Sequence, residues 1–119
     1  MRTFTPAAAA LVLVQAACGS PALAGELVKV NISDLAFAPA DITVQVGDAV
    51  EWVNADFIDH TATAKSGDWD VLIPAGKSDR VVLRRPGAVV YYCRFHPGMT
   101  GTIHIVAADA LIRLQEKKP

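Results

Sequence analysis

The stretch ADITVQVGDAVEWVNAD, residues 40–56, alternates apolar and polar residues in two short segments on either side of a Gly-Asp pair. In the first segment Ile42, Val44 and Val46 recur at every second position, and the second segment continues the same alternation. Successive side chains of a strand point to opposite faces, so this pattern predicts two strands covered on one side only. The Gly-Asp pair between them predicts a turn.

The same period of two continues on both sides of this stretch. Pairs and short runs of Pro, Gly, Ser and Asp separate the alternating segments, and they predict loops or turns. Several short strands at a spacing of about ten residues, without a strong helical period, predict an all-β sandwich or barrel. The further strands are expected at 26–34, 80–85, 88–93 and 102–106, with loops at 66–68 and 74–77 and a turn at 86–87.

The N-terminal residues differ in composition from the alternating region. Arg2 provides a positive start, an apolar run interrupted only by Gln15 follows, and Ala-Leu-Ala precedes position 25. These features predict a signal peptide at 1–24, and its apolar run is too short to span a bilayer. A second interpretation makes Cys18 the lipidated first residue of a lipoprotein, although Gln15 stands where such signals usually carry leucine.

Removal of that leader would leave a domain at 25–106 and a C-terminal extension at 107–119. The extension is rich in helix formers, which favours a short C-terminal helix or a frayed end. No other segment is apolar enough for a transmembrane span, so we expect an exported, periplasmic protein. The formal net charge is −1 and a basic run is absent before Lys117, which argues against nucleic-acid binding.

The segment YYCRFHPGMTG, residues 91–101, contains three side chains with soft or borderline donor atoms: Cys93, His96 and Met99. Without the leader, Cys93 is the only cysteine, and an unpaired thiol in an oxidising compartment needs protection by burial or by a metal. Zinc would accept the thiolate and the imidazole, but a thioether is a poor zinc ligand. Two histidines, one cysteine and a weak axial methionine are the donor set of blue copper.

This donor set needs a second histidine, which is either His60 or His104. His60 follows the strand expected to end at Asn54, in a position where a loop leads into the next strand. His104 lies between Ile103 and Ile105 in a predicted strand, and alternation places it on the outer face if its neighbours face inward. We therefore expect His60 to join the cluster and His104 to be a surface residue.

The segments FAPADITVQVGDAVEWVNAD…H and YYCRFHPGMTG together resemble the cupredoxin family of blue copper proteins, in particular its amicyanin branch. The short Cys-x2-His-x2-Met spacing, with proline after the histidine, carries the resemblance to amicyanins. It implies a Greek-key β-sandwich in which His60, Cys93, His96 and Met99 bind one copper ion. It also implies a monomeric one-electron carrier, not an enzyme, that meets transient redox partners such as a cytochrome or a dehydrogenase.

The sequence departs from the family pattern at two positions near the expected ligands. Thr61 follows the first histidine where many members have asparagine, and its hydroxyl reaches less far. Phe95 replaces the proline that amicyanins tend to have before the second histidine, which restores an N–H donor toward the Cys93 sulfur. Because hydrogen bonds to this sulfur tune the potential, we expect a higher reduction potential than a proline would produce.

Two other functions use the same residues. A copper-binding or copper-delivery protein without a dedicated redox partner needs the same four ligands. An enzyme with Cys93 as nucleophile and His96 as base would need a substrate pocket and an orienting third group, neither of which the sequence indicates. Outside the cluster, Trp52 and Tyr91 are expected in the core.

Overall fold

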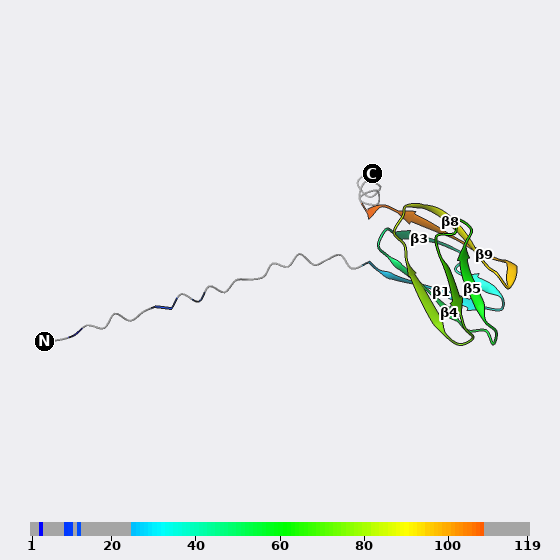
Figure 1. Ribbon diagram of the computed structural model, residues 1–119, viewed down its shortest axis with the longest axis horizontal. Coiled ribbons are helices and arrows are strands. Elements are labelled where there is room, and N and C mark those ends of the chain that lie inside the picture. Colours follow the sequence, from blue (N-terminus) through cyan, green and yellow to red (C-terminus); the bar gives the residue numbers. More distant parts are fainter. Residues whose placement is uncertain (1–2, 4–8, 11, 13–24, 109–119) are drawn as a thin grey trace, which may run out of the picture.

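The computed structural model describes residues 25–108 and the separate positions 3, 9, 10 and 12. In this part of the chain nine strands form two sheets that pack face to face (Figure 1). The strands are β1 (Leu27–Ser33), β2 (Ala36–Ala38), β3 (Asp41–Gln45), β4 (Ala49–Asn54), β5 (His60–Ala64), β6 (Asp70–Ile73), β7 (Ser78–Val82), β8 (Gly87–Cys93) and β9 (His96–Val106).

The four-stranded sheet has the order β2-β1-β4-β7, and the five-stranded sheet has the order β3-β9-β8-β5-β6. The pairs β1–β4 and β3–β9 are parallel, whereas the other neighbours are antiparallel. Consecutive strands β3 and β4 lie in different sheets, so the chain crosses the sandwich at the Gly-Asp turn. This architecture confirms the predicted all-β, cupredoxin-like β-sandwich.

The predicted alternation is visible in the burial of the side chains. Val30 and Ile32 of β1 and Trp52 of β4 are completely buried, as are Tyr91 and Ile103 of the other sheet. The ring centroids of Trp52 and Tyr91 are 5.5 Å apart, so the inner faces of both sheets meet in aromatic contacts. The expectation that Trp52 and Tyr91 belong to the core is confirmed.

Three strands, β2, β5 and β6, were not expected from the sequence. All five residues of β5 are buried, and its sequence HTATA has no large apolar residue, so the alternation of threonine and alanine is a weak signal for a strand. The expected strand at 80–85 is shifted, because β7 begins at Ser78 and ends at Val82. Strand β9 begins at His96, six residues before the expected strand at 102–106.

The expectations for both ends of the chain concern residues that the structure largely leaves undescribed. The signal peptide at 1–24 and the helix within 107–119 fall almost wholly outside the described residues. The described residues contain no helix that is long and apolar enough to cross a bilayer.

Candidate metal centre

Two neighbouring strands place Cys93 and His96 side by side. Strand β8 ends at Cys93 and β9 begins at His96, and these two residues are cross-strand partners around a two-residue connection. The register shifts at Tyr92 and Cys93, an irregularity of the kind that reorients side chains at the end of a sheet. Strand β5 pairs with β8 and begins with His60, so the same end of the sheet also carries the first histidine.

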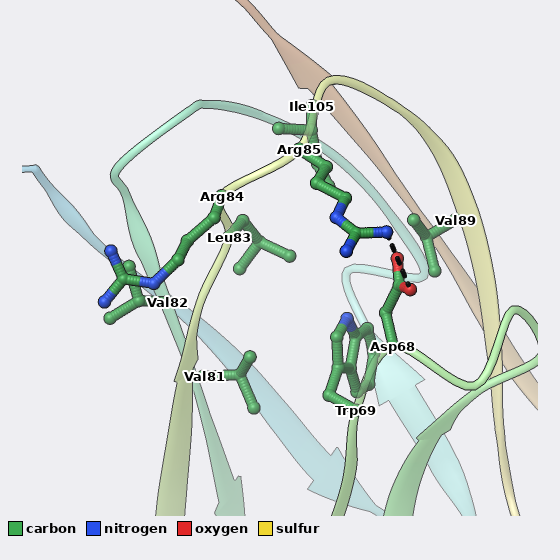
Figure 2. Close-up of a pocket in the computed structure, with 9 residues that line it drawn as sticks. All are labelled: Asp68, Trp69, Val81, Val82, Leu83, Arg84, Arg85, Val89 and Ile105. Atoms are coloured by element: carbon green, nitrogen blue, oxygen red, sulfur yellow. Dashed lines mark ion pairs between the residues drawn. The ribbon is translucent and has the colours of Figure 1, made fainter.

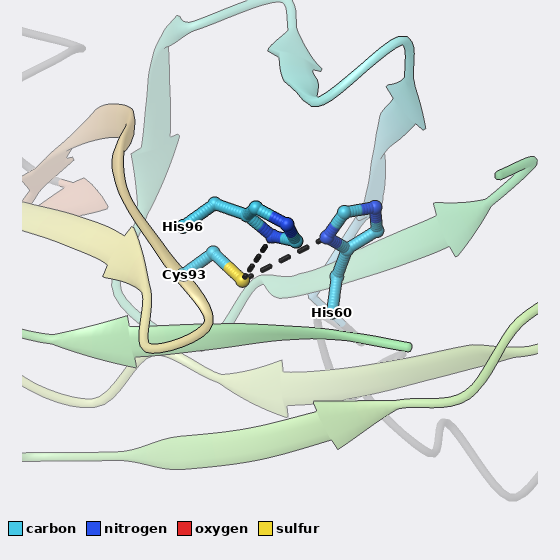
Figure 3. Close-up of side chains that lie close together, drawn as sticks. All are labelled: His60, Cys93 and His96. Carbon is cyan, nitrogen blue, oxygen red and sulfur yellow. Dashed lines mark hydrogen bonds between the residues drawn. The ribbon is translucent and has the colours of Figure 1, made fainter. Parts of the chain in front are cut away.

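Figure 3 shows the side chains of His60, Cys93 and His96 converging at this end of the sheet. The Nδ1 atom of His60 lies 3.7 Å from Cys93 Sγ, and the Nδ1 atom of His96 lies 3.8 Å from it. One donor atom from each of the three residues lies within 4.8 Å of the others. His60 and Cys93 are completely buried, whereas His96 is half-buried.

These separations fit one shared metal ion. A nitrogen donor at a bond length of about 2.0–2.1 Å and a sulfur donor at about 2.3 Å, with an angle of about 120° between them, are about 3.7–3.8 Å apart. Both imidazoles direct Nδ1 toward the sulfur, so both present the same kind of donor atom. The donor set of one thiolate and two imidazoles suits copper.

The structure also places the two remaining candidates from the sequence. Met99 lies on β9, three residues after His96, and only 5% of its surface is exposed. His104 is exposed on the same strand, whereas Ile103 and Ile105 are buried, as alternation predicts.

The surroundings of Cys93 favour its thiolate. Burial raises the pKa of the thiol, but N–H and imidazole groups around Sγ outweigh burial and lower the pKa to about 6. The strongest of these groups is the backbone N–H of Thr61, which donates to Sγ over 3.3 Å. The backbone N–H of Phe95 also lowers the pKa, which agrees with the donor that replacement of proline restores. The thiolate is the form of cysteine that binds metals.

The carboxylate of Asp56 orients the buried His60 ring. Its Oδ2 atom lies 2.8 Å from His60 Nε2 and accepts a hydrogen bond from the Leu35 N–H, while Oδ1 accepts from the Asp34 N–H. The N–H of Leu35 is the main cause that lowers the pKa of Asp56, and His60 adds to it. A proton held on Nε2 by this carboxylate leaves Nδ1 free to bind a metal.

Sequence reasoning missed the role of Asp56. Its contacts come from the turn between β1 and β2, where both Asp34 and Leu35 have positive φ angles, of 52° and 60°. The spacing of four residues between Asp56 and His60 was the only local signal for this pair.

A pocket of about 310 Å³ lies at the other end of the β8–β9 pair (Figure 2). Its walls are mainly aliphatic and aromatic, and Arg85 forms an ion pair with Asp68 at 3.8 Å across it. Val89 and Ile105 line this pocket, far along their strands from Cys93 and His96. The pocket therefore does not provide a substrate site for a Cys93–His96 pair.

Known proteins resemble the chain in both sequence and structure. Residues 24–106 match the family model of copper binding proteins, plastocyanin/azurin family. Amicyanin-alpha of Methylorubrum extorquens is 34% identical over 81 residues, which cover 63% of this chain and 68% of that protein. The crystal structure of amicyanin from Paracoccus versutus has a TM-score of 0.59 at 25% identity, covering 73% of this chain and 85% of that one.

A copper-containing nitrite reductase from Thermus scotoductus is also similar, with a TM-score of 0.58 and 29% identity. The match covers 66% of this chain but only 22% of the reductase, so the likeness concerns a small part of that enzyme.

The fold and the donor cluster define a cupredoxin, a β-sandwich with a metal site at one end. The chain belongs to the plastocyanin/azurin family of copper-binding proteins. Within this family it resembles amicyanin. Copper is therefore its cofactor, and blue copper electron transfer is its general activity.

Proposed function

We propose that His60, Cys93, His96 and Met99 bind one copper ion as a type 1 site and that the protein carries single electrons between redox partners. The observation that carries this proposal is the convergence of one thiolate and two imidazole donors within 4.8 Å. The buried thioether of Met99, on the same strand as His96, would supply the weak fourth donor. When bound, copper supplies the Cu(I)/Cu(II) couple.

The protein holds these donors in place and shields His60 and Cys93 from water. His60 and Cys93 are completely buried at the ends of strands that belong to one sheet, so their positions depend on the packed sandwich. Asp56 fixes the His60 ring, and the Thr61 N–H holds the sulfur. A donor set fixed in this way changes little between the two oxidation states, which favours fast electron transfer.

His96 is the place where electrons enter or leave. Its side chain is half-buried, and its neighbours Phe95, Pro97 and Gly98 are exposed. Phe95 exposes 52% of its surface, so an apolar side chain next to His96 in the sequence is available to a partner. Small interfaces of this kind suit weak and transient redox complexes.

We infer that the protein works in the periplasm as a monomer, after export directed by residues 1–24. Its partners would be redox proteins such as a cytochrome or a dehydrogenase, and it would turn over no substrate. The similarity to amicyanin supports the electron-carrier role over copper delivery.

The first test is the visible spectrum of the purified protein after addition of one equivalent of Cu(II). An intense blue absorption from thiolate-to-copper charge transfer is expected, and Cys93→Ser should abolish it by removing the thiolate. His104→Ala is the control and should keep the colour, because His104 is exposed and separate from the cluster. A wild-type protein that stays colourless would contradict the proposal.

A further inference from the structure

Two threonines on the outer face of β5 are unusual in being buried. Ala62 belongs to the core, so alternation directs Thr61 and Thr63 to the opposite face of the sheet. Thr61 is nevertheless completely buried, and Thr63 exposes only 9% of its surface. A buried hydroxyl needs hydrogen-bond partners, which raises the question of where these two groups find theirs.

The hydroxyl groups of Thr61 and Thr63 form a continuous hydrogen-bonded chain to the surface. It starts at the connection between β8 and β9, residues 93–96, which we call the Cys93 loop. The N–H of Arg94, next to Cys93, donates to Thr61 Oγ1 over 2.8 Å. Thr61 Oγ1 lies 2.9 Å from Thr63 Oγ1, and Thr63 Oγ1 donates to Asp70 Oδ1 over 2.7 Å. The side chain of Arg94 also donates to Asp70 Oδ1, with Nε at 3.2 Å from it. The hydrogen bonds therefore form a closed ring that begins and ends at Arg94.

The carboxylate decides the direction of this chain. Ionised Asp70 accepts hydrogen bonds and cannot donate them, so the Thr63 proton points toward Asp70. Thr63 Oγ1 must then accept from the Thr61 hydroxyl, which leaves a lone pair of Thr61 Oγ1 for the Arg94 N–H. The hydrogen bond from Thr63 is the main cause that lowers the pKa of Asp70, which agrees with this direction.

We propose that Thr61, Thr63 and Asp70 are positioning residues that lock the Cys93 loop to β5 and thereby set the reduction potential of the bound copper. This inference rests on the proposed function. Thr61 contacts the loop twice, because its N–H donates to Cys93 Sγ while its hydroxyl accepts from the Arg94 N–H. The distance between the Thr61 N–H and the sulfur therefore depends on the hydroxyl chain.

Loss of the chain should lower the reduction potential. An N–H donor stabilises the sulfur more strongly when the site is reduced, because the thiolate then carries more negative charge. A loop free to move from β5 lengthens this hydrogen bond and removes part of that stabilisation. A carboxylate at the end of the chain also polarises each hydroxyl and strengthens the hydrogen bonds before it.

The decisive comparison is between Asp70→Ala and Asp70→Asn. Both variants remove the same negative charge, but only asparagine keeps an oxygen that accepts from Thr63. The side chain of Asp70 is 49% exposed, so both variants should fold. We expect the copper protein with Asp70→Ala to have a lower reduction potential than the protein with Asp70→Asn, measured by protein-film voltammetry. Equal potentials would overturn the proposal.

A second comparison tests the middle of the chain. Thr63→Val should lower the potential, whereas Thr63→Ser keeps the hydroxyl and should restore it. Thr43→Val is the matched control, because Thr43 is an exposed strand residue on β3 outside the chain. A shift that is the same for Thr63→Val and Thr43→Val would contradict the proposed role.

A measurement on the metal-free protein separates this inference from the proposed function. Hydrogen exchange of the Arg94 amide, followed by NMR, should become about tenfold faster with Asp70→Ala than with Asp70→Asn, since a hydrogen bond of ordinary strength is weakened. An Arg94 amide that exchanges equally fast in both variants would overturn the proposal that the hydrogen-bonded chain holds the Cys93 loop. A colourless wild-type copper complex would instead overturn the proposed function, whatever this amide does.

Discussion

At the scale of single residues, the contact between Gly101 and Tyr91 controls how closely β8 and β9 pack near the metal centre. The two residues are cross-strand partners, and Tyr91 is completely buried two residues before Cys93. A Cβ atom at position 101 would lie 2.5 Å from Cζ of Tyr91 and 2.6 Å from its Oη. The absence of a side chain at Gly101 therefore makes room for the tyrosine ring.

Gly101→Ala should destabilise the protein by about 1–3 kcal/mol, the usual cost of overpacking a core. The free energy of unfolding of the metal-free protein, from urea titration, is the measurement. Gly98→Ala is the control, since a Cβ there meets nothing within 4 Å, and it should change stability by less than about 0.5 kcal/mol. Equal stabilities for the two variants would show that Tyr91 moves aside without cost.

Phe95 acts on the same sulfur through its backbone. Its N–H is one of the groups that lower the pKa of Cys93, and proline at this position would remove it. Phe95→Pro should lower the reduction potential by a few tens of mV, as expected for loss of one hydrogen bond of about 1 kcal/mol. Phe95→Ala keeps the N–H and is the control in voltammetry. An unchanged or higher potential for the proline variant would contradict this explanation.

At the scale of secondary-structure elements, Asp48 joins three strands at the turn where the chain changes sheets. Its Oδ1 atom accepts from the Glu26 N–H, next to β1, and its Oδ2 atom accepts from the Gln45 N–H at the end of β3. Asp48 is nearly buried, with 8% of its surface exposed. The carboxylate thus anchors the start of β1 to the connection between β3 and β4.

Asp48→Ala should lower the free energy of unfolding by about 1.5–3 kcal/mol, because two partly buried hydrogen bonds lose their charged acceptor. Urea titration of the metal-free protein measures the change. Asp79→Ala removes the same charge from an exposed position on β7 and should have little effect. If both substitutions cost the same, net charge and not the hydrogen bonds would explain the loss.

The success of sequence reasoning at this scale depends on whether one face of a strand meets water. Strands β1, β3 and β4 alternate between buried and more exposed residues, so their periodicity could be recognised. Strand β5 is buried by the core on one face and by the Cys93 loop and Asp70 on the other, and its alternation of threonine and alanine involves too little apolar surface to mark a strand. The contacts that bury the outer face of β5 are the same contacts through which Thr61 and Thr63 hold the Cys93 loop.

At the scale of the whole molecule, the metal centre lies at the edge of a much larger hydrophobic core. The hydrophobic core spans both sheets and includes two of the proposed ligands, Cys93 and Met99. Most of its residues, such as Trp52 and Ile103, are not ligands. The fold therefore does not need copper as its main source of stability, and copper should add to the stability of a folded protein.

Removal of copper should leave the β-sheet circular dichroism spectrum intact and lower the midpoint of thermal unfolding. Free copper at about 100 times its Kd stabilises the native state by about 2.7 kcal/mol, so the midpoint should rise with copper concentration. Cys93→Ser should abolish most of this dependence. Loss of the β-sheet spectrum in the metal-free protein would show that the core does not maintain the fold without copper.

Alternation and donor atoms are local properties, so the class of the fold and the chemistry of the site could be predicted before any contact was known. The period of two predicted a β-sandwich, and the spacing of Cys93, His96 and Met99 indicated copper. The groups that support the ligands are identified by the tertiary structure alone, since it brings Thr61 to Cys93 across 32 positions and Asp70 to Arg94 across 24. Such contacts arise from the pairing and packing of distant strands, which no local pattern records.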